Sequence, residues 1–244
     1  MSLSIHSNTI EIVAHRGYAA IFPENTMLAF QRSLQLGAHS IELDVHHSKE
    51  GIPVVIHDDK LNRTTTGSGY IREKSLAEIR LADAGVKFNP RFAGCRVPIL
   101  EEVLDLLAGR FGLQLELKEG INEREAKGLL HLLNIYGMID HTMIISFYKS
   151  NLELIRKLHP GIEVGFLTSD IIALEPVAAL GRASVCLDYH IPLKYPKIIK
   201  EAEELGIDVT VWTIRQAHTA KKLYDLGIRR FTSDIPLRPD LTAL

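Results

Sequence analysis

Short apolar runs alternate with longer amphipathic segments along almost the whole chain. Eight of the short runs are rich in apolar and β-branched residues and are followed by turn residues, which is typical of buried strands. They occupy residues 11–15, 40–45, 113–118, 142–147, 163–168, 184–189, 208–214 and 229–234. Strands that alternate with helical segments in this way predict a parallel sheet.

Seven helical segments are predicted between these strands. The clearest, LEEVLDLLAG, has apolar residues at positions 100, 103, 104 and 107, which is the spacing of one helix face. Another begins at Thr26, a common capping residue, and stops at Gly37. The predicted ranges are 26–36, 100–109, 123–137, 150–161, 171–181, 195–206 and 217–227, and the fifth has the weakest pattern.

A ninth strand-like run, PVVIHD at residues 53–58, does not fit the parallel series. Only the turn KEG separates it from the preceding strand, which is too short for a parallel crossover. We therefore predict an antiparallel hairpin that opens an insertion over residues 46–98. Eight parallel strands in this length favour a (β/α)8 TIM barrel, formed by a single domain over residues 1–244. A doubly wound sheet is the alternative, because periodicity does not show whether a sheet closes.

The composition is that of an ordinary soluble globular protein, with 46% hydrophobic and 24% charged residues among 244. A net charge of −2 argues against a protein built to hold nucleic acid or an anionic membrane. Cys95 and Cys186 lie far apart and are expected to be free thiols of a reducing compartment. With no secretory signal and no apolar run long enough to span a membrane, the chain is predicted to be cytoplasmic. The oligomeric state is not predicted.

Acidic residues gather on two of the predicted strands. Glu42 and Asp44 are two residues apart, so both side chains point to one face of their strand. Glu116 is placed in the same way on the next barrel strand. Carboxylates that converge on one barrel mouth repel each other unless a cation lies among them, and oxygen ligands select Mg²⁺ or Ca²⁺. Surface or salt-bridged acids are the alternative for any one pair, but their repetition on adjacent strands favours a metal site.

Two cations and two histidines complete the candidate chemistry. With a divalent ion and three carboxylates, Arg16 and Lys118 leave one net positive charge, which matches a phosphodiester anion. His15 ends the first strand and His57 lies on the hairpin; both could transfer protons near neutral pH. Asp58 is expected to orient His57 or to cap the turn.

The ordered set AHRG, PENT, IELDV, VVIHDDKLNRTTTGSG, LELK, VWT and SDIP resembles the glycerophosphodiester phosphodiesterase family. The resemblance covers nearly the whole chain and implies a metal-dependent TIM-barrel enzyme. Such enzymes hydrolyse glycerophosphodiesters, which are small molecules, to sn-glycerol 3-phosphate and an alcohol.

The resemblance also implies a role for each candidate residue. It makes His15 and His57 the acid–base pair, without saying which is the acid. The implied metal ligands are Glu42, Asp44 and Glu116, and the implied substrate-binding residues are Arg16, Lys118 and Trp212.

Two departures from the family pattern concern the last strands. The chain reads VWTIR, with Arg215 where family members commonly carry Asn, and its final strand reads RRFTSDIP. These differences leave undecided which alcohol the enzyme prefers and which residues form the rim of its pocket. Trp212 could wall the pocket or belong to the core.

Two other functions remain as alternatives at this point. A related barrel phospholipase or sphingomyelinase D would release a cyclic phosphate from a lipid, but it would need an apolar rim and usually a secretory signal. A barrel that only binds phosphorylated ligands would have no use for two proton-transferring histidines.

Overall fold

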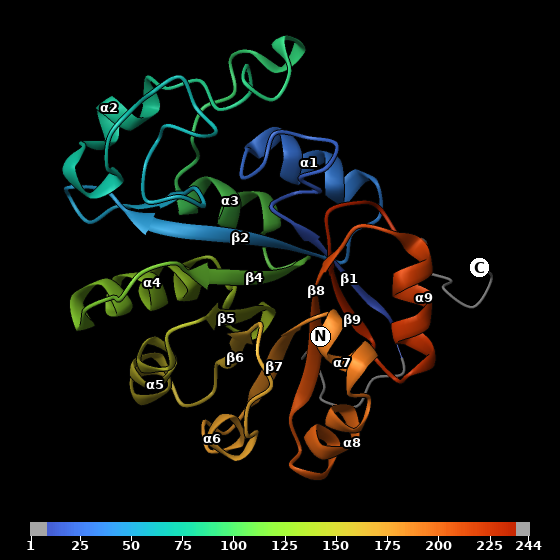
Figure 1. Ribbon diagram of the computed structural model, residues 1–244. Helices are drawn as coiled ribbons and strands as arrows, with labels where there is room; N and C mark the ends of the chain where they lie inside the picture. Colours follow the sequence, from blue (N-terminus) through green and yellow to red (C-terminus); the bar gives the residue numbers. More distant parts are fainter. Residues whose placement is uncertain (1–8, 238–244) are drawn as a thin grey trace.

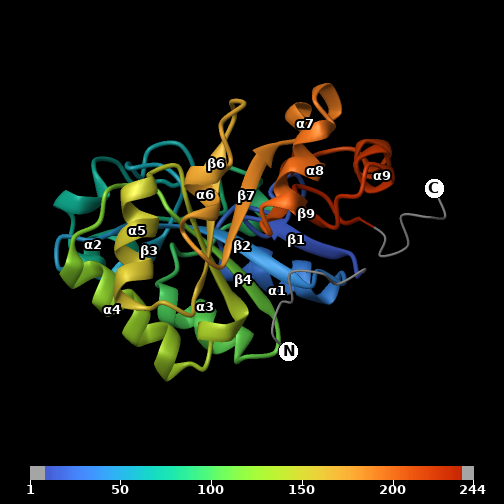
Figure 2. The ribbon, with the colours of Figure 1, turned by 90° about the horizontal axis from the view of Figure 1, so that it is seen from below.

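The computed structural model describes residues 9–237, and eight parallel strands form a closed barrel at its centre (Figures 1 and 2). The barrel strands are β1 (Glu11–His15), β2 (Ser40–His47), β4 (Gly112–Leu117), β5 (Thr142–Ser146), β6 (Glu163–Thr168), β7 (Ala183–Asp188), β8 (Asp208–Ile214) and β9 (Arg230–Ser233). They are hydrogen-bonded in the order β1-β9-β8-β7-β6-β5-β4-β2, and β2 pairs with β1 again. This closure confirms the TIM barrel and excludes the doubly wound sheet.

Helices surround the barrel, as Figure 1 shows. They are α1 (Met27–Gln35), α3 (Leu100–Leu107), α4 (Glu123–Ile135), α5 (Lys149–Leu158), α6 (Glu175–Ala178), α7 (His190–Lys194), α8 (Lys197–Glu204) and α9 (Ala217–Asp225). The prediction for 171–181 was too long, because the helix starts next to Pro176 and Gly181 follows it closely. The short α7 was not predicted. Within residues 9–237, no helix is both long and apolar enough to cross a membrane.

The predicted hairpin is present beside the barrel. β3 (Pro53–Val55) pairs antiparallel with β2, with Val55 opposite Val45. The insertion then contains α2 (Leu76–Arg80) and two 3-10 turns, Ile71–Glu73 and Pro90–Phe92. β2 continues to His47, so the insertion leaves the barrel two residues later than predicted.

The insertion has a small apolar cluster of its own, separate from the main core. Its buried members are Val54, Ile56, Leu61, Ile71, Ile79, Ala82, Ala84 and Val97. In Figure 1 the insertion lies at the far end of β2, next to α1 and α3. This cluster holds in place the segment that carries His57.

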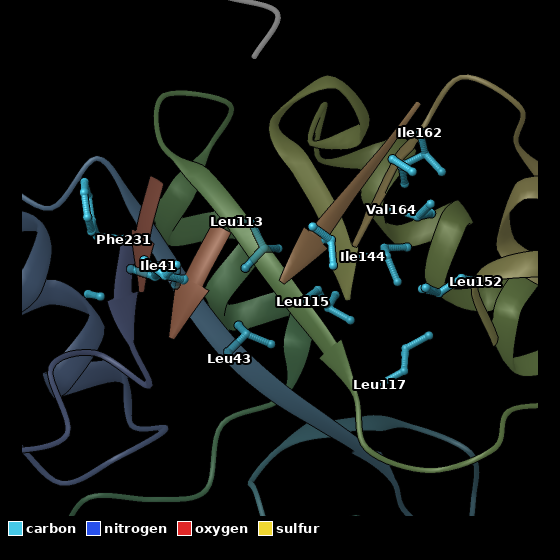
Figure 3. Close-up of a cluster of buried hydrophobic side chains, with 14 of the residues drawn as sticks. Ile41, Leu43, Leu113, Leu115, Leu117, Ile144, Leu152, Ile162, Val164 and Phe231 are labelled. Atoms are coloured by element: carbon cyan, nitrogen blue, oxygen red, sulfur yellow. The ribbon is translucent and has the colours of Figure 1, made fainter. Parts of the chain in front are cut away.

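Strand periodicity decides which side chains enter the barrel. On β4, Leu113, Leu115 and Leu117 pack into the main core between strands and helices (Figure 3). The intervening Gln114 and Glu116 line the cavity inside the barrel mouth. A one-residue shift would therefore exchange the core face and the functional face of this strand.

A buried ion network closes the amino-terminal end of the barrel. Arg230, at the start of β9, donates from Nε to Glu11 Oε2 at 2.7 Å and from Nη1 to Glu163 Oε1 at 2.8 Å. The unusual Arg230 of the RRFTSDIP segment thus belongs to the floor of the barrel. Arg230 does not line the cavity at the barrel mouth, so this part of the difference does not change the pocket rim, which the sequence had left open.

Candidate active site

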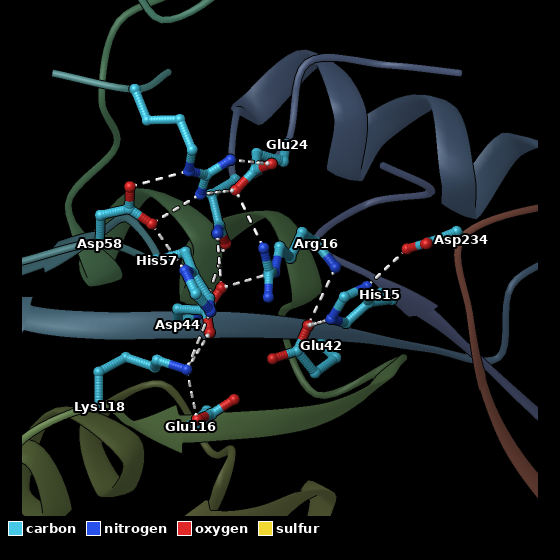
Figure 4. A network of polar contacts seen from close by, with 12 residues as sticks. His15, Arg16, Glu24, Glu42, Asp44, His57, Asp58, Glu116, Lys118 and Asp234 are labelled. Atoms are coloured by element: carbon cyan, nitrogen blue, oxygen red, sulfur yellow. Dashed lines mark hydrogen bonds and ion pairs between the residues drawn. The ribbon is translucent and has the colours of Figure 1, made fainter. Parts of the chain in front are cut away.

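A cavity of about 580 Å³ opens at the carboxyl ends of the barrel strands. Seven of the eight residues predicted from the sequence line it: His15, Arg16, Glu42, His57, Glu116, Lys118 and Trp212. The eighth, Asp44, is completely buried and lies beside Arg16 and Lys118 (Figure 4). The fold therefore brings together residues that are up to 197 positions apart in the sequence (15 to 212).

Sheet register assembles the three carboxylates. In the parallel ladder, Glu42 on β2 is paired with His15 on β1, and Asp44 on β2 is paired with Glu116 on β4. Ligand atoms of Glu42, Asp44 and Glu116 all lie within 4.8 Å of one another, and the three residues are buried. The spacing of two residues on β2 thus places both its carboxylates on the inner face.

Burial and mutual repulsion act on these carboxylates. The pKa of Glu42 is raised well above its usual value by burial and by the charges of Asp44 and Glu116. Burial and Asp44 also raise the pKa of Glu116, to about 7. Burial opposes ionisation of Asp44 as well, but Arg16 and Lys118 outweigh it and lower its pKa.

The three carboxylates fit a metal ion. Glu42 Oε1 and Asp44 Oδ1 are buried and have no hydrogen-bond partner in the structure, an arrangement that is costly unless a cation satisfies them. An all-carboxylate donor set suits a hard divalent cation. These residues could therefore hold a metal ion.

Arg16 is held in place by three acidic residues. Its Nη1 donates to Glu24 Oε1 at 3.1 Å, and its Nε lies 3.1 Å from Asp44 Oδ2 in an ion pair without hydrogen-bond alignment. Its backbone N–H donates to Glu42 Oε2 at 3.0 Å. Gly17 lets the chain turn here, since its φ is +80° and a Cβ would lie 2.7 Å from that of Ala29.

His57 lies between an aspartate and a lysine. Its Nδ1 is 2.8 Å from Asp58 Oδ1, and its Nε2 is 3.1 Å from Lys118 Nζ. Because an ammonium group can only donate, Nε2 accepts and the proton of the neutral ring is on Nδ1. Burial lowers the pKa of His57, and Arg16 and Lys118 act in the same direction.

Neighbouring polar groups hold this histidine in place. Asp58 accepts two hydrogen bonds from Arg63, which lower the pKa of Asp58 to about 2. His46, on β2, donates from Nε2 to the backbone carbonyl of His57 at 3.0 Å. Asp58 therefore orients His57, which is one of the two roles that the sequence allowed for it.

His15 also contacts an aspartate through Nδ1. That atom is 2.6 Å from Asp234 Oδ1, while Nε2 is 3.9 Å from Glu42 Oε2. Asp234 accepts a second hydrogen bond from Arg215 Nε at 2.7 Å. Burial opposes ionisation of Asp234, but these two partners together lower its pKa.

Trp212 serves both of the roles considered for it. Its Nε1 donates to the Cys186 carbonyl at 2.9 Å, and it packs against the apolar layer inside the barrel. It also lines the cavity, with the Phe147 ring at 5.7 Å in an edge-on arrangement. Trp212 and Phe147 thus give the cavity an aromatic surface, and Lys118 Nζ lies 6.0 Å from the centroid of the Phe147 ring. Cys95 and Cys186 are both free thiols, as predicted.

Four residues of the polar network were not identified from the sequence as site residues. They are Glu24, Asn25, Arg63 and Asp234. Asp234 follows the last strand directly, so the rule that polar residues at strand ends form the site could have found it. Asn25 and Glu24 were interpreted only as the start of α1, and nothing in the sequence pairs Arg63 with them.

The fold and the site together define a class: a TIM-barrel enzyme equipped for hydrolysis at phosphorus. The model of the glycerophosphoryl diester phosphodiesterase family matches residues 15–238. A glycerophosphodiester phosphodiesterase of Caldanaerobacter subterraneus subsp. tengcongensis is 32% identical, over 92% of this chain and 94% of that protein. One of Bacillus altitudinis is 35% identical, over 93% and 96%.

Solved structures agree with these relatives. A phosphodiesterase of Oleispira antarctica, in complex with the product sn-glycerol 3-phosphate, superposes with a TM-score of 0.86 at 30% identity and covers 98% of both chains. The chain belongs to the glycerophosphoryl diester phosphodiesterase family and is a hydrolase.

Proposed function

We propose that this protein hydrolyses glycerophosphodiesters to sn-glycerol 3-phosphate and an alcohol, with the help of a divalent cation. The observation that carries the proposal is the convergence of Glu42, Asp44 and Glu116 within 4.8 Å, with His15 and His57 lining the same cavity. The product bound to the Oleispira antarctica relative supports this substrate class.

The metal, held by Glu42, Asp44 and Glu116, would be Mg²⁺ or Ca²⁺ and would polarise a phosphoryl oxygen. Lys118 and the N–H groups of Arg16 that face the cavity would pair with the phosphate anion. Trp212 would contact the glycerol side of the substrate through its apolar face.

The hydrogen bonds of the two histidines suggest different roles. His57 Nε2 accepts from Lys118, so we assign it the proton of the attacking oxygen, either of water or of the glycerol 2-hydroxyl. His15 is the other histidine that lines the cavity, so we assign it the donation of a proton to the leaving alkoxide. The P–O bond to the alcohol breaks as the new P–O bond forms. If the 2-hydroxyl attacks, the first product is a cyclic phosphate, and water must then break one ring P–O bond to give sn-glycerol 3-phosphate.

The test is turnover of glycerophosphocholine by the wild-type protein and by His15→Ala and His57→Ala, with the products resolved by phosphorus NMR. We expect sn-glycerol 3-phosphate and choline, and a loss of about 100-fold or more for each variant. Near-normal turnover by both variants would contradict the histidine assignment. A cyclic phosphate as the final product would favour a phospholipase D-like reaction, and binding without product would favour a non-catalytic barrel.

Leaving groups separate the two histidines. His15→Ala should be less harmful with a p-nitrophenyl phosphodiester than with glycerophosphocholine, because p-nitrophenolate leaves without a proton. His57→Ala should harm both substrates similarly. The reverse pattern would exchange the two roles while leaving the proposed reaction intact.

A further inference from the structure

Asp234 and Arg215 form a contact chain behind His15 that the reaction described above does not explain. Asp234 Oδ1 is 2.6 Å from His15 Nδ1, and its Oδ2 accepts from Arg215 Nε at 2.7 Å. Figure 4 shows His15 between Asp234 on one side and Glu42 on the other. Asp234 itself lines the rim of the cavity.

The backbone around Asp234 is fixed on two sides. Its N–H donates to the Ile214 carbonyl at 2.9 Å, and its carbonyl accepts from the Ala20 N–H at 3.2 Å. These bonds tie the end of β9 to the end of β8 and to the loop that follows β1. A carboxylate mounted in this way, with only 8% of its side chain exposed, has little freedom to leave His15.

The contact determines which nitrogen of His15 faces the site. With Nδ1 bound to Asp234, Nε2 points toward Glu42, at 3.9 Å from its Oε2. A ring flip would move Nδ1 away from Asp234 and take Nε2 out of this position. The hydrogen bond of a carboxylate to the far nitrogen is a general means of fixing a histidine's tautomer and orientation.

The other histidine has the same arrangement, built from different segments. His57 Nδ1 contacts Asp58, and Asp58 accepts hydrogen bonds from Arg63. Each ring therefore presents Nε2 to the cavity and has an aspartate held by an arginine behind it. One Arg–Asp–His series comes from the insertion, and the other comes from the ends of the last two barrel strands. The arrangement is therefore not a result of local sequence.

We propose that Asp234, anchored by Arg215, is the positioning residue for His15 in the proposed phosphodiesterase reaction. Asp234 acts through His15 and does not touch the substrate phosphate. Arg215 contributes less, because 69% of its side chain is exposed to solvent. This inference rests on the proposed function, but its structural part can be tested without it.

The kinetic test uses Asp234→Asn and Arg215→Gln with glycerophosphocholine. Asp234→Asn should lower kcat by about 10- to 1000-fold and leave KM nearly unchanged, because the substrate contacts remain. Arg215→Gln should lower kcat by about two- to fivefold. Arg215→Lys should restore part of that loss, and Asp234→Glu part of the larger one.

A double-mutant cycle separates positioning from a general structural effect. If Asp234 acts only through His15, Asp234→Asn should change the residual turnover of the His15→Ala variant by less than about twofold. A p-nitrophenyl phosphodiester keeps that residual turnover measurable. An equal loss in both backgrounds, or full kcat in Asp234→Asn alone, would overturn the proposal.

Matched controls come from the same part of the fold. Asp188 and His190 form another Asp–His contact, at 2.8 Å, but neither lines the cavity. Arg229 donates to the backbone carbonyls of Tyr224 and Ile228 and does not line the cavity either. Asp188→Asn and Arg229→Gln should therefore leave kcat unchanged. A loss of kcat in the Asp188 variant similar to that in Asp234→Asn would mean that any such change near β7 to β9 is harmful, which would overturn the specific role.

Nitrogen NMR of the histidine rings in the metal-free protein gives a readout that is independent of activity. At a pH at which the ring is neutral, the wild-type protein should carry the His15 proton on Nδ1, and Asp234→Asn should shift the neutral ring toward the Nε2-protonated form; the proton donated in the reaction is a second one, bound at Nε2. An unchanged tautomer would contradict the positioning role. A wild-type protein with the Nδ1–H tautomer but no turnover would instead contradict the proposed function.

Discussion

At the scale of single residues, the segment Pro23–Thr26 performs two tasks with neighbouring side chains. Thr26 caps α1 by accepting the Ala29 N–H, as its sequence pattern indicated. Asn25 turns the other way: its Nδ2 donates to Asp44 Oδ2 at 2.7 Å, and its Oδ1 accepts from the Asp44 N–H at 3.3 Å. Asn25 thus orients the central carboxylate of the triad.

Replacing Asn25 by Ala should weaken metal binding by about 10- to 100-fold, because groups that orient a ligand contribute this much to metal affinity. The measurement is a calorimetric titration of the metal-free protein with Mg²⁺ or Ca²⁺. Thr26→Ala is the matched control, since it removes a cap worth about 1 kcal/mol but leaves Asp44 untouched. Equal metal affinity in the Asn25 variant and the wild type would contradict the orienting role.

At the scale of elements, the insertion matters because it carries His57 and places it at the cavity. β3 is only three residues long, so the pairing with β2 alone gives little stability. The apolar cluster defined above supplies the rest, and Leu61, which is 1% exposed, lies in it between Asp58 and Arg63 in the sequence. The position of His57 therefore depends on a small core outside the barrel.

Leu61→Ala should destabilise the insertion by about 2–5 kcal/mol through the cavity it creates. Hydrogen exchange should rise first within residues 48–99, and kcat should fall because His57 is less often in place. Leu152→Ala is the control: Leu152 is equally buried in α5 (Figure 3) and should lower the global stability without a selective effect on the insertion. Uniform exchange in both variants would argue against a locally stabilised insertion.

The same elements show what the sequence could predict. The alternation along β2 and β4 was enough to place Glu42, Asp44 and Glu116 on the inner face, and the three-residue turn required the antiparallel β3. Contacts between side chains of distant segments, such as Arg63 with Glu24 or Asp234 with His15, leave no periodic pattern. The length of α6 was overestimated because the weak pattern over 171–181 was not weighed against Pro176 and Gly181, which limit the helix.

At the scale of the whole molecule, charge is concentrated at the two ends of the barrel. At the floor, Arg230 is paired with Glu11 and Glu163. At the mouth, Glu42, Asp44 and Glu116 face only two cations, Arg16 and Lys118, among the residues described here. At the mouth, the three carboxylates therefore outnumber the two cations by one charge.

This imbalance predicts a pH-dependent effect of the metal on stability. The pKa of Glu116 is about 7 in the metal-free protein, above its value in the unfolded chain, and that of Glu42 is also raised. At these two groups the folded state therefore binds more protons than the unfolded state from about pH 4.5 to 7, so their contribution to the free energy of unfolding falls as the pH rises through this window. A divalent cation competes with these protons and reverses that loss.

The measurement is the melting temperature with and without saturating Mg²⁺, from about pH 5.5 to 8. The increase that Mg²⁺ produces should grow with pH and should be smaller and flatter in Glu116→Gln. An increase that stays constant or declines across this range would show that the three carboxylates do not bind the cation.

The most direct test of the whole account is to titrate the metal-free protein with Mg²⁺ or Ca²⁺ while measuring sn-glycerol 3-phosphate released from glycerophosphocholine. The account predicts no turnover in EDTA, turnover that rises in proportion to occupancy of a single site, and loss of both binding and turnover in Asp44→Asn. Full turnover in EDTA, or turnover that does not follow metal occupancy, would contradict it.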